Sequence, residues 1–354
     1  MINLYTHLET KFDDVDSTLQ VSTDKVWNAL NPKNKNGKYS AYSIVEKTKK
    51  FRDEVYSINH ISKYKQSYFR HEKLLDYLCK DGVLKRIVTS KPDDFENISN
   101  SIYNYLNKDD LYIKKGNSYF KTSFGELLYK RVFNYDNYRR NIIVGEVYKE
   151  LGFDKVTCPY CNSEPVTIID SKQGSSKKNS KLTLFELDHF YPKSKYPYLA
   201  LSFYNHIPSC SNCNGKLKRS RDFTIGTHIH PYNRCFDEAY TFYPNTDISR
   251  GNKLKSLSLW NKSGQMDYLA KDLLLEKRYL KLFHLCNANE LIELMQDNYD
   301  LFESGEDDRL RKLFFRSIES HIKVNKGEIL TSNFSKLKRD LVKFFDQQKA
   351  IIKD

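Results

Sequence analysis

The chain has 354 residues, and its 58 lysines and arginines exceed its 45 aspartates and glutamates by 13. Hydrophobic residues make up 39% of the sequence and the mean hydropathy is −0.68, so no stretch approaches the roughly 20 apolar residues that span a bilayer. The first residues lack the apolar core of a secretory signal, and we therefore expect a cytoplasmic protein. The basic excess favours a polyanionic partner, although lysine-rich surfaces are also common without one.

Residues 1–151 are predicted to form a helical region. Between Ser40 and Lys80, apolar residues recur three to four positions apart without an internal Pro or Gly, a pattern typical of helices. Two further helical stretches are expected over 97–107 and 125–151. The sequence assigns no chemistry to this region.

Residues 152–245 differ in character and are expected to form a small module with short strands. Two extended segments are predicted, at 165–170 and 182–188. The run from Ser171 to Lys181 between them is rich in Ser, Lys and Gly, which predicts a flexible basic loop.

The helical period returns from Gln265 to the last residue, so 246–354 is predicted to be a second helical region. The expected fold class is therefore α+β, a mainly helical chain with a small central module. No internal repeat is evident.

Seven cysteines in a chain without an export signal argue against a disulfide framework. Four of them form two C-x-x-C pairs, Cys158 with Cys161 and Cys210 with Cys213, and 48 residues separate the pairs. Each pair places two sulfurs on one tight turn, and two such turns supply the four thiolates of a closed, structural Zn²⁺ site. The alternative is four unrelated buried thiols. A redox-active pair is disfavoured because no βαβ pattern surrounds either motif.

A second pattern lies between the two cysteine pairs. The stretch FELDHFYPKS alternates as a strand, ends in Asp188 and His189, and continues into a turn that begins with proline. Asn205 follows 16 residues after His189, and Asn214 follows nine residues later, directly behind the second cysteine pair.

This order of residues resembles the HNH endonuclease motif in its zinc-stapled form. The matching elements are L-D-H-F-Y-P-K-S, then L-S-x-x-N, then C-x-x-C-N-x-K-x-x-R, over about 158–222. The resemblance implies a ββα-metal fold, in which a strand presents the histidine, a loop carries the middle asparagine and a helix bears the last ligand. The resemblance says nothing direct about the flanking regions, which the helical periodicity alone describes. Three domains are therefore expected: a helical domain at 1–151, the HNH nuclease module at 152–245, and a helical domain at 246–354.

Hydrolysis of a phosphodiester requires an activated water and stabilisation of the charge on the phosphate. A neutral imidazole, whose ordinary pKa is about 6.5, suits the first task, so His189 is predicted to be the general base. By resemblance, Asp188 and the side-chain oxygen of Asn214 hold a catalytic Mg²⁺ or Mn²⁺, while Asn205 fixes its loop and orients His189. Many relatives have His at the last position, and Asn214 there favours an oxygen-ligated cation.

Three other histidines remain alternative contributors. His206 adjoins Asn205, and His228 and His230 stand two apart, which would place them on one face of a strand. Six cations flank the motif and are predicted to contact phosphates, with ordinary solvated charge as the alternative for each: Lys193, Lys195, Lys216, Lys218, Arg219 and Arg221.

The sequence therefore predicts a metal-dependent HNH endonuclease that acts on DNA, with RNA left open as a substrate. The chain is similar to the HNH nuclease subunit of Septu-type anti-phage systems, which implies a defence role and an ATPase partner. The chain has no P-loop motif of its own, and its helical flanks are the expected docking surfaces for that partner or for a second copy. The alternatives are a site-specific, restriction-type HNH endonuclease and a non-catalytic zinc adaptor that binds nucleic acid.

Overall fold

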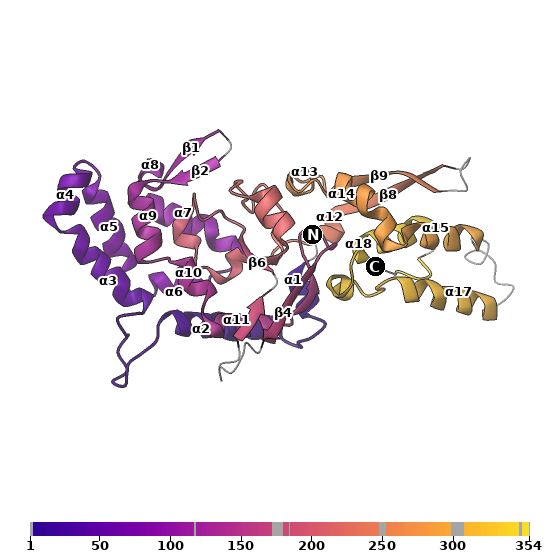
Figure 1. Cartoon of the computed structure of the whole chain (residues 1–354), viewed down its shortest axis with the longest axis horizontal. Coiled ribbons are helices and arrows are strands. Elements are labelled where there is room, and N and C mark those ends of the chain that lie inside the picture. The colour runs from indigo at the N-terminus through magenta and orange to yellow at the C-terminus, as the bar shows by residue number, and fades with distance from the viewer. Residues whose placement is uncertain are drawn as a thin grey trace.

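The computed structural model describes residues 3–116, 118–171, 180–183, 185–247, 253–298, 308–346 and 349–353. Figure 1 shows an elongated molecule, with the N-terminal helices at one end, a central region of short strands, and the C-terminal helices at the other end. Most of the predicted basic loop, residues 172–179, lies outside the described residues. Within the described ranges, every helix is too short or too polar to cross a membrane.

Helices dominate the first 151 residues, as predicted. The continuous run expected from Ser40 to Lys80 is divided into three helices, separated at Ser57 and Ser67. The region also contains a short antiparallel hairpin, which the sequence did not predict. The elements are α1 Leu4–Leu8, α2 Val15–Leu30, α3 Ile44–Val55, α4 Ile58–Tyr64, α5 Tyr68–Leu78, α6 Val83–Thr89, η1 Pro92–Asp94, α7 Phe95–Tyr103, α8 Lys108–Leu111, β1 Tyr112–Lys115, β2 Ser118–Lys121, α9 Ser123–Arg131, α10 Tyr135–Arg139 and α11 Ile142–Glu150.

The helix expected over 125–151 is also broken twice, and asparagine explains both breaks. The side chain of Asn134 accepts a hydrogen bond from the backbone N–H of Asn137 at 3.2 Å, and that of Asn141 accepts one from Ile143 at 3.0 Å. An asparagine that satisfies exposed backbone N–H groups in this way begins a new helix rather than continuing the previous one. The short helix α10 between these two caps is thereby set at its own angle, against the central module.

The central module consists of small antiparallel sheets, in line with the predicted α+β class. Strands β3, β4 and β5 form one sheet, and β6 pairs with β7 so that Asp188 faces Ile207 and His189 faces His206. Short helical turns fill the connections. The elements are β3 Lys155–Thr157, β4 Pro165–Ser171, β5 Ser180–Thr183, β6 Glu186–His189, η2 Pro197–Leu199, η3 Phe203–Asn205, β7 His206–Ser209, η4 Asn212–Lys218 and α12 Phe236–Ala239.

The C-terminal region opens with a long hairpin and then becomes helical. The predicted boundary at 245/246 falls inside β8, so the first part of the region predicted as helical is a strand pair. Its elements are β8 Tyr240–Asp247, β9 Lys253–Asn261, α13 Leu269–Asp272, α14 Leu275–Leu282, η6 Phe283–Cys286, α15 Ala288–Asp297, α17 Asp308–His321, η7 Lys326–Thr331 and α18 Ser335–Phe345.

Two hydrophobic cores lie among the described residues, and their boundary differs from the predicted one. The first core runs from the N-terminal helices into the central module without a break at 151/152; for example, the rings of Tyr148 and Phe203 stack 5.7 Å apart. The second core joins β8 and β9 to the C-terminal helices, with Met295, Ile318 and Leu341 fully buried. The N-terminal helices therefore share one core with the strands that carry the predicted motif.

Candidate functional site

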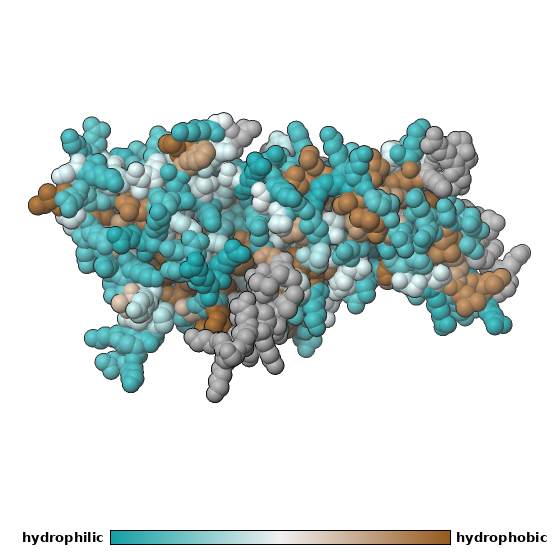
Figure 2. Space-filling model, in the orientation of Figure 1, coloured by the Kyte–Doolittle hydropathy of each residue, from teal (hydrophilic) through white to brown (hydrophobic). Residues whose placement is uncertain are grey.

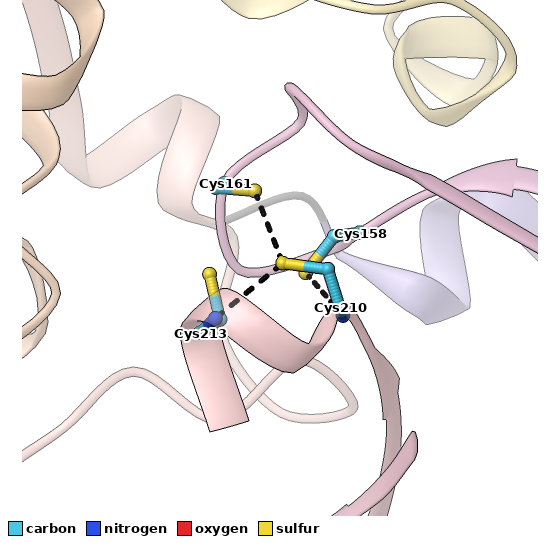
Figure 3. A group of neighbouring side chains, drawn as sticks. All are labelled: Cys158, Cys161, Cys210 and Cys213. Atoms are coloured by element: carbon cyan, nitrogen blue, oxygen red, sulfur yellow. Dashed lines mark hydrogen bonds between the residues drawn. The ribbon is translucent and has the colours of Figure 1, made fainter. Parts of the chain in front are cut away.

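The four predicted zinc ligands come together in one buried cluster. Cys158 and Cys161 lie on the turn between β3 and β4, and Cys210 and Cys213 lie where β7 passes into η4 (Figure 3). All four sulfurs lie within 4.8 Å of one another, and the Sγ atoms of Cys161 and Cys210 are 3.9 Å apart. Four ligands at about 2.3 Å around a tetrahedral ion would have sulfurs just under 4 Å apart, so the cluster can hold a metal such as zinc.

The surroundings of the cluster suit thiolate ligands. The backbone N–H groups of Cys210 and Cys213 point to the sulfurs of Cys158 and Cys210, each at 3.4 Å. Arg278 on α14 donates from Nη1 to the Sγ atom of Cys213 at 3.2 Å, and it also pairs with Glu164 at 3.2 Å. Four thiolates and one divalent cation carry a net charge of −2, so a guanidinium at this distance lowers the cost of burying them.

The Asp-His pair, the second asparagine and several cations line one cavity of about 380 Å³ beside the cysteine cluster. Residues from β6, from the turn after it and from η4 form most of the wall. The lining residues are Lys121, Tyr135, Arg139, Glu186, Leu187, Asp188, His189, Pro192, Lys193, Ser194, Asn214, Arg219 and Ser220. Asp188, His189 and Asn214, which the sequence placed at one site, are therefore neighbours in space.

Asp188 is 2% exposed and already has two polar partners. The hydroxyl of Tyr160 donates to its Oδ2 atom at 2.6 Å, and the Nζ atom of Lys218 donates to its Oδ1 atom at 3.1 Å. Lys218 also donates to the carbonyl of His189 at 2.6 Å. The aspartate is therefore held in a fixed position by an ion pair that the sequence did not predict.

His189 is oriented by a main-chain carbonyl. Its Nε2 atom lies 3.2 Å from the carbonyl oxygen of Ala200, and the Nε2 atom of His206 lies 3.0 Å from the same oxygen. Because a carbonyl only accepts, we assign the N–H of each ring to Nε2, which leaves the lone pair of His189 on Nδ1. Burial lowers the pKa of His189 well below 6.5, and the positive charge of Lys193 lowers it further, so the ring is neutral at pH 7.

Asn205 is fully buried and holds the loop that follows β6. Its Oδ1 atom accepts from the N–H of Tyr191 at 2.7 Å, while its Nδ2 atom donates to the carbonyls of Tyr191 and Leu199 at 3.1 and 3.0 Å. Ala200, which contacts His189, directly follows this anchored segment. Asn205 therefore holds the loop from behind the cavity and is not part of its wall.

Asn214 lines the cavity from η4 and donates through Nδ2 to the Oε2 atom of Glu186 at 2.7 Å. This bond leaves the amide oxygen of Asn214 as the atom that can bind another group. Glu186 had no predicted role. Its position two residues before Asp188 on one strand was the available signal, since such residues share a face.

The six predicted phosphate contacts are placed very differently from one another. Lys193 and Arg219 line the cavity, and Lys216 is exposed on η4. Lys195 pairs with Asp222, and Arg221 pairs with Asp272 at 3.0 Å.

The prediction that Lys218 contacts phosphate is wrong, because Lys218 is fully buried and forms an ion pair with Asp188. A cation in that position neutralises the aspartate and is not available on the surface. Lys218 faces inward from η4, which is a turn of π-helix, and no pattern in the sequence predicts that geometry.

Of the alternative histidines, only His206 is next to the cavity. Its Nε2 atom is 3.3 Å from that of His189, and burial lowers its pKa to about 3. His228 stacks on Phe223 and contacts Asp272 at 3.2 Å, while His230 packs against Phe190. Neither His228 nor His230 lines the cavity.

Part of the cavity wall comes from the helical region to which the sequence assigned no chemistry. Lys121 on β2 and Tyr135 and Arg139 on α10 all line the cavity. The hydroxyl of Tyr135 donates to the carbonyl of Leu187 at 3.2 Å, and its ring lies 4.7 Å from the Nζ atom of Lys193. No local pattern around these residues could have indicated this role.

Comparisons with known proteins yield one partial similarity. No family model matches the chain, and no solved structure matches it. A 61-residue alignment with "Septu protein PtuB" of Bacillus thuringiensis has 38% identity and covers 14% of this chain and 23% of that protein. The matched part therefore spans less than a quarter of that protein, and it links the chain to Septu proteins weakly.

Proposed function

We propose that this protein is a metal-dependent HNH endonuclease that hydrolyses phosphodiester bonds in DNA as part of an anti-phage defence system. The observation that carries the proposal is the convergence of His189, Asp188 and Asn214 on one cavity beside the cysteine cluster. These residues are up to 26 positions apart in the sequence, and their order is that of the HNH motif.

His189 is the proposed general base. Its Nε2 atom is occupied by the carbonyl of Ala200, so Nδ1 is the nitrogen that takes a proton from water. The loop anchored by Asn205 keeps that carbonyl in place, which restricts rotation of the imidazole. A neutral, oriented imidazole in the wall of a cavity meets the geometric requirement of a base.

The donor atoms of the cavity suit a hard divalent cation. Asp188 and Asn214 offer oxygen ligands, and Glu186 places a second carboxylate against Asn214. Each oxygen of Asp188 can accept more than one bond, so its contacts with Tyr160 and Lys218 leave capacity for a cation. Mg²⁺ or Mn²⁺, when bound, supplies charge stabilisation at the phosphate and at the leaving oxygen.

The rim of the cavity suits an anionic substrate. Lys193, Arg139 and Arg219 surround the opening, and both arginines are exposed. Positive side chains that contact the backbone phosphates would fix the position of the DNA in the site without recognising its base sequence. The weak similarity to a Septu protein supports the defence setting, and a partner ATPase belongs to the same proposal.

Cleavage of supercoiled plasmid in Mg²⁺ or Mn²⁺ tests the activity. We expect His189→Ala to lower the rate on the order of 100-fold to 10,000-fold, as for loss of a general base. His228→Gln is the matched control, because it changes a buried histidine of the same module outside the cavity and should cut as the wild type does.

A wild-type protein that cuts nothing in either metal, or a His189→Ala variant that cuts at the wild-type rate, would refute the proposal. Defined fragments would indicate a restriction-type enzyme, whereas degradation to a smear would indicate an effector.

A further inference from the structure

The β1–β2 hairpin projects from the N-terminal helical part of the molecule (Figure 1), and its Lys121 lines the cavity of the candidate site. Four residue pairs connect its strands, among them Ile113 with Phe120 and Lys114 with Tyr119. Residues 112–121 include three lysines and no acidic residue. Of the described hairpin residues, only Lys121 lines the cavity of the candidate site.

The hairpin is anchored to the central module by its inner face. The Nζ atom of Lys195 lies 4.9 Å from the ring of Tyr119 and 5.7 Å from that of Tyr112, and Lys195 pairs with Asp222. At the other end of β2, Lys121 lines the cavity and pairs with Glu126 at 3.1 Å. The hairpin is therefore continuous with the wall of the site.

The outer face of the hairpin is exposed to solvent. Ile113 is 44% exposed and Phe120 is 50% exposed, and they are cross-strand partners. Lys114 and Lys115 are exposed and form no ion pair with any residue within the described ranges. Figure 2 shows this spot as a small hydrophobic patch bordered by hydrophilic atoms. Because side chains alternate along a strand, Lys115 shares the outer face with Ile113 and Phe120, whereas Lys114 lies on the opposite face, 5.9 Å from the ring of Tyr119. The hairpin therefore presents an exposed cation on each face and an exposed apolar pair on one, which suits a ligand that has both apolar and anionic surface.

We propose that the β1–β2 hairpin is a finger that binds duplex DNA beside the cleavage cavity. Lys115 on the outer face and Lys114 on the inner face contact phosphates on the two sides of the hairpin, and Ile113 and Phe120 pack against the sugars of the adjoining groove. A two-stranded ribbon has a width that a DNA groove accepts, and its lysines release counterions from the duplex. This inference rests on the proposed nuclease function for its choice of ligand.

The test is binding of the full-length protein to a fluorescent mixed-sequence duplex, measured by anisotropy without Mg²⁺ or Mn²⁺ so that cleavage does not interfere. Lys114→Gln with Lys115→Gln removes two phosphate contacts. Each contact contributes about 5.5-fold at roughly 0.15 M salt, so we expect binding about 30-fold weaker and a salt dependence reduced by roughly 1.8 in slope. Phe120→Ser should weaken binding about fivefold without changing that slope.

A matched control changes two exposed lysines at another place. Lys35→Gln with Lys38→Gln alters the connection between α2 and α3, which lies on the opposite edge of the molecule from the hairpin in Figure 1. This pair removes the same charge and should change affinity less than threefold if the contacts are local.

The outcomes separate the two proposals. Hairpin variants that bind duplex as tightly as the wild type, or no more weakly than the control, would overturn the finger and would point to a protein partner on this surface. A wild-type chain that binds DNA through the hairpin but never cuts it would overturn the nuclease and leave the finger standing.

Discussion

Replacing Lys218 with methionine tests whether Asp188 is held by an interior ion pair. Lys218 lies 3.1 Å from the carboxylate and 2.6 Å from the carbonyl of His189, and both side chains of the pair are at most 2% exposed. Among the described residues, the substitution leaves the buried carboxylate with the Tyr160 hydroxyl as its hydrogen-bond donor, at 2.6 Å. Removing one partner of a buried pair costs about 3–5 kcal/mol. At roughly 2–3 °C for each kcal/mol, the midpoint of thermal unfolding should fall by about 10 °C.

A double-mutant cycle isolates the interaction between the two charges. Asp188→Asn alone leaves a buried ammonium without its counter-ion, whereas Asp188→Asn with Lys218→Met removes both charges together. The double variant should therefore be at least about 2 kcal/mol more stable than the sum of the single losses predicts.

Urea denaturation of the zinc-loaded protein without Mg²⁺, followed through the buried Trp27 in the same core, measures these free energies. Lys216→Met is the control, because Lys216 is exposed on the same turn and its loss should change stability by no more than about 0.5 kcal/mol. The interior pair would be refuted if the stability lost in the double variant equalled the sum of the two single losses to within about 0.5 kcal/mol. A Lys218 variant as stable as the Lys216 control would also refute it.

Three further predictions concern the metal cluster, the loop and the buried histidines. Cys161→Ser should lose bound zinc by elemental analysis, whereas Cys286→Ser, a buried thiol of the second core, should keep about one zinc per chain; equal zinc contents would contradict the assignment. Asn205→Ala removes three buried hydrogen bonds and should cost about 2–3 kcal/mol in urea denaturation, and a loss below about 0.5 kcal/mol would contradict its anchoring role. Burial lowers the pKa values of His71 and His230 to about 3, so below pH 6.5 the unfolded chain binds protons that the folded protein does not. The free energy of unfolding should fall by about 1.4 kcal/mol per pH unit for each histidine as the pH is lowered from 6.5 to 4. His230→Gln should reduce that slope by about 1.4 kcal/mol per pH unit, which corresponds to one proton, and an unchanged slope would show that His230 does not contribute to the pH dependence.

The sequence by itself determined the local parts of the candidate site. A C-x-x-C pair closes a turn within four residues, so its two sulfurs are neighbours whatever the rest of the chain does. The strand that carries Asp188 and His189 is likewise specified by its own alternation and by the proline turn after it. These patterns were sufficient to predict the cysteine cluster, and the structure brings its four sulfurs together.

Only the tertiary structure decided which groups surround those residues. Arg278 reaches the cysteine cluster from α14, and Tyr135 and Arg139 reach the cavity beside strand β6 from α10, across more than 45 residues of chain. Contacts over such separations depend on how the helices pack against the module, and no local spacing encodes that packing. The same reason explains Lys218, which looked like one more surface cation in a basic stretch. Its position on a turn of π-helix directs it into the interior, where it neutralises Asp188.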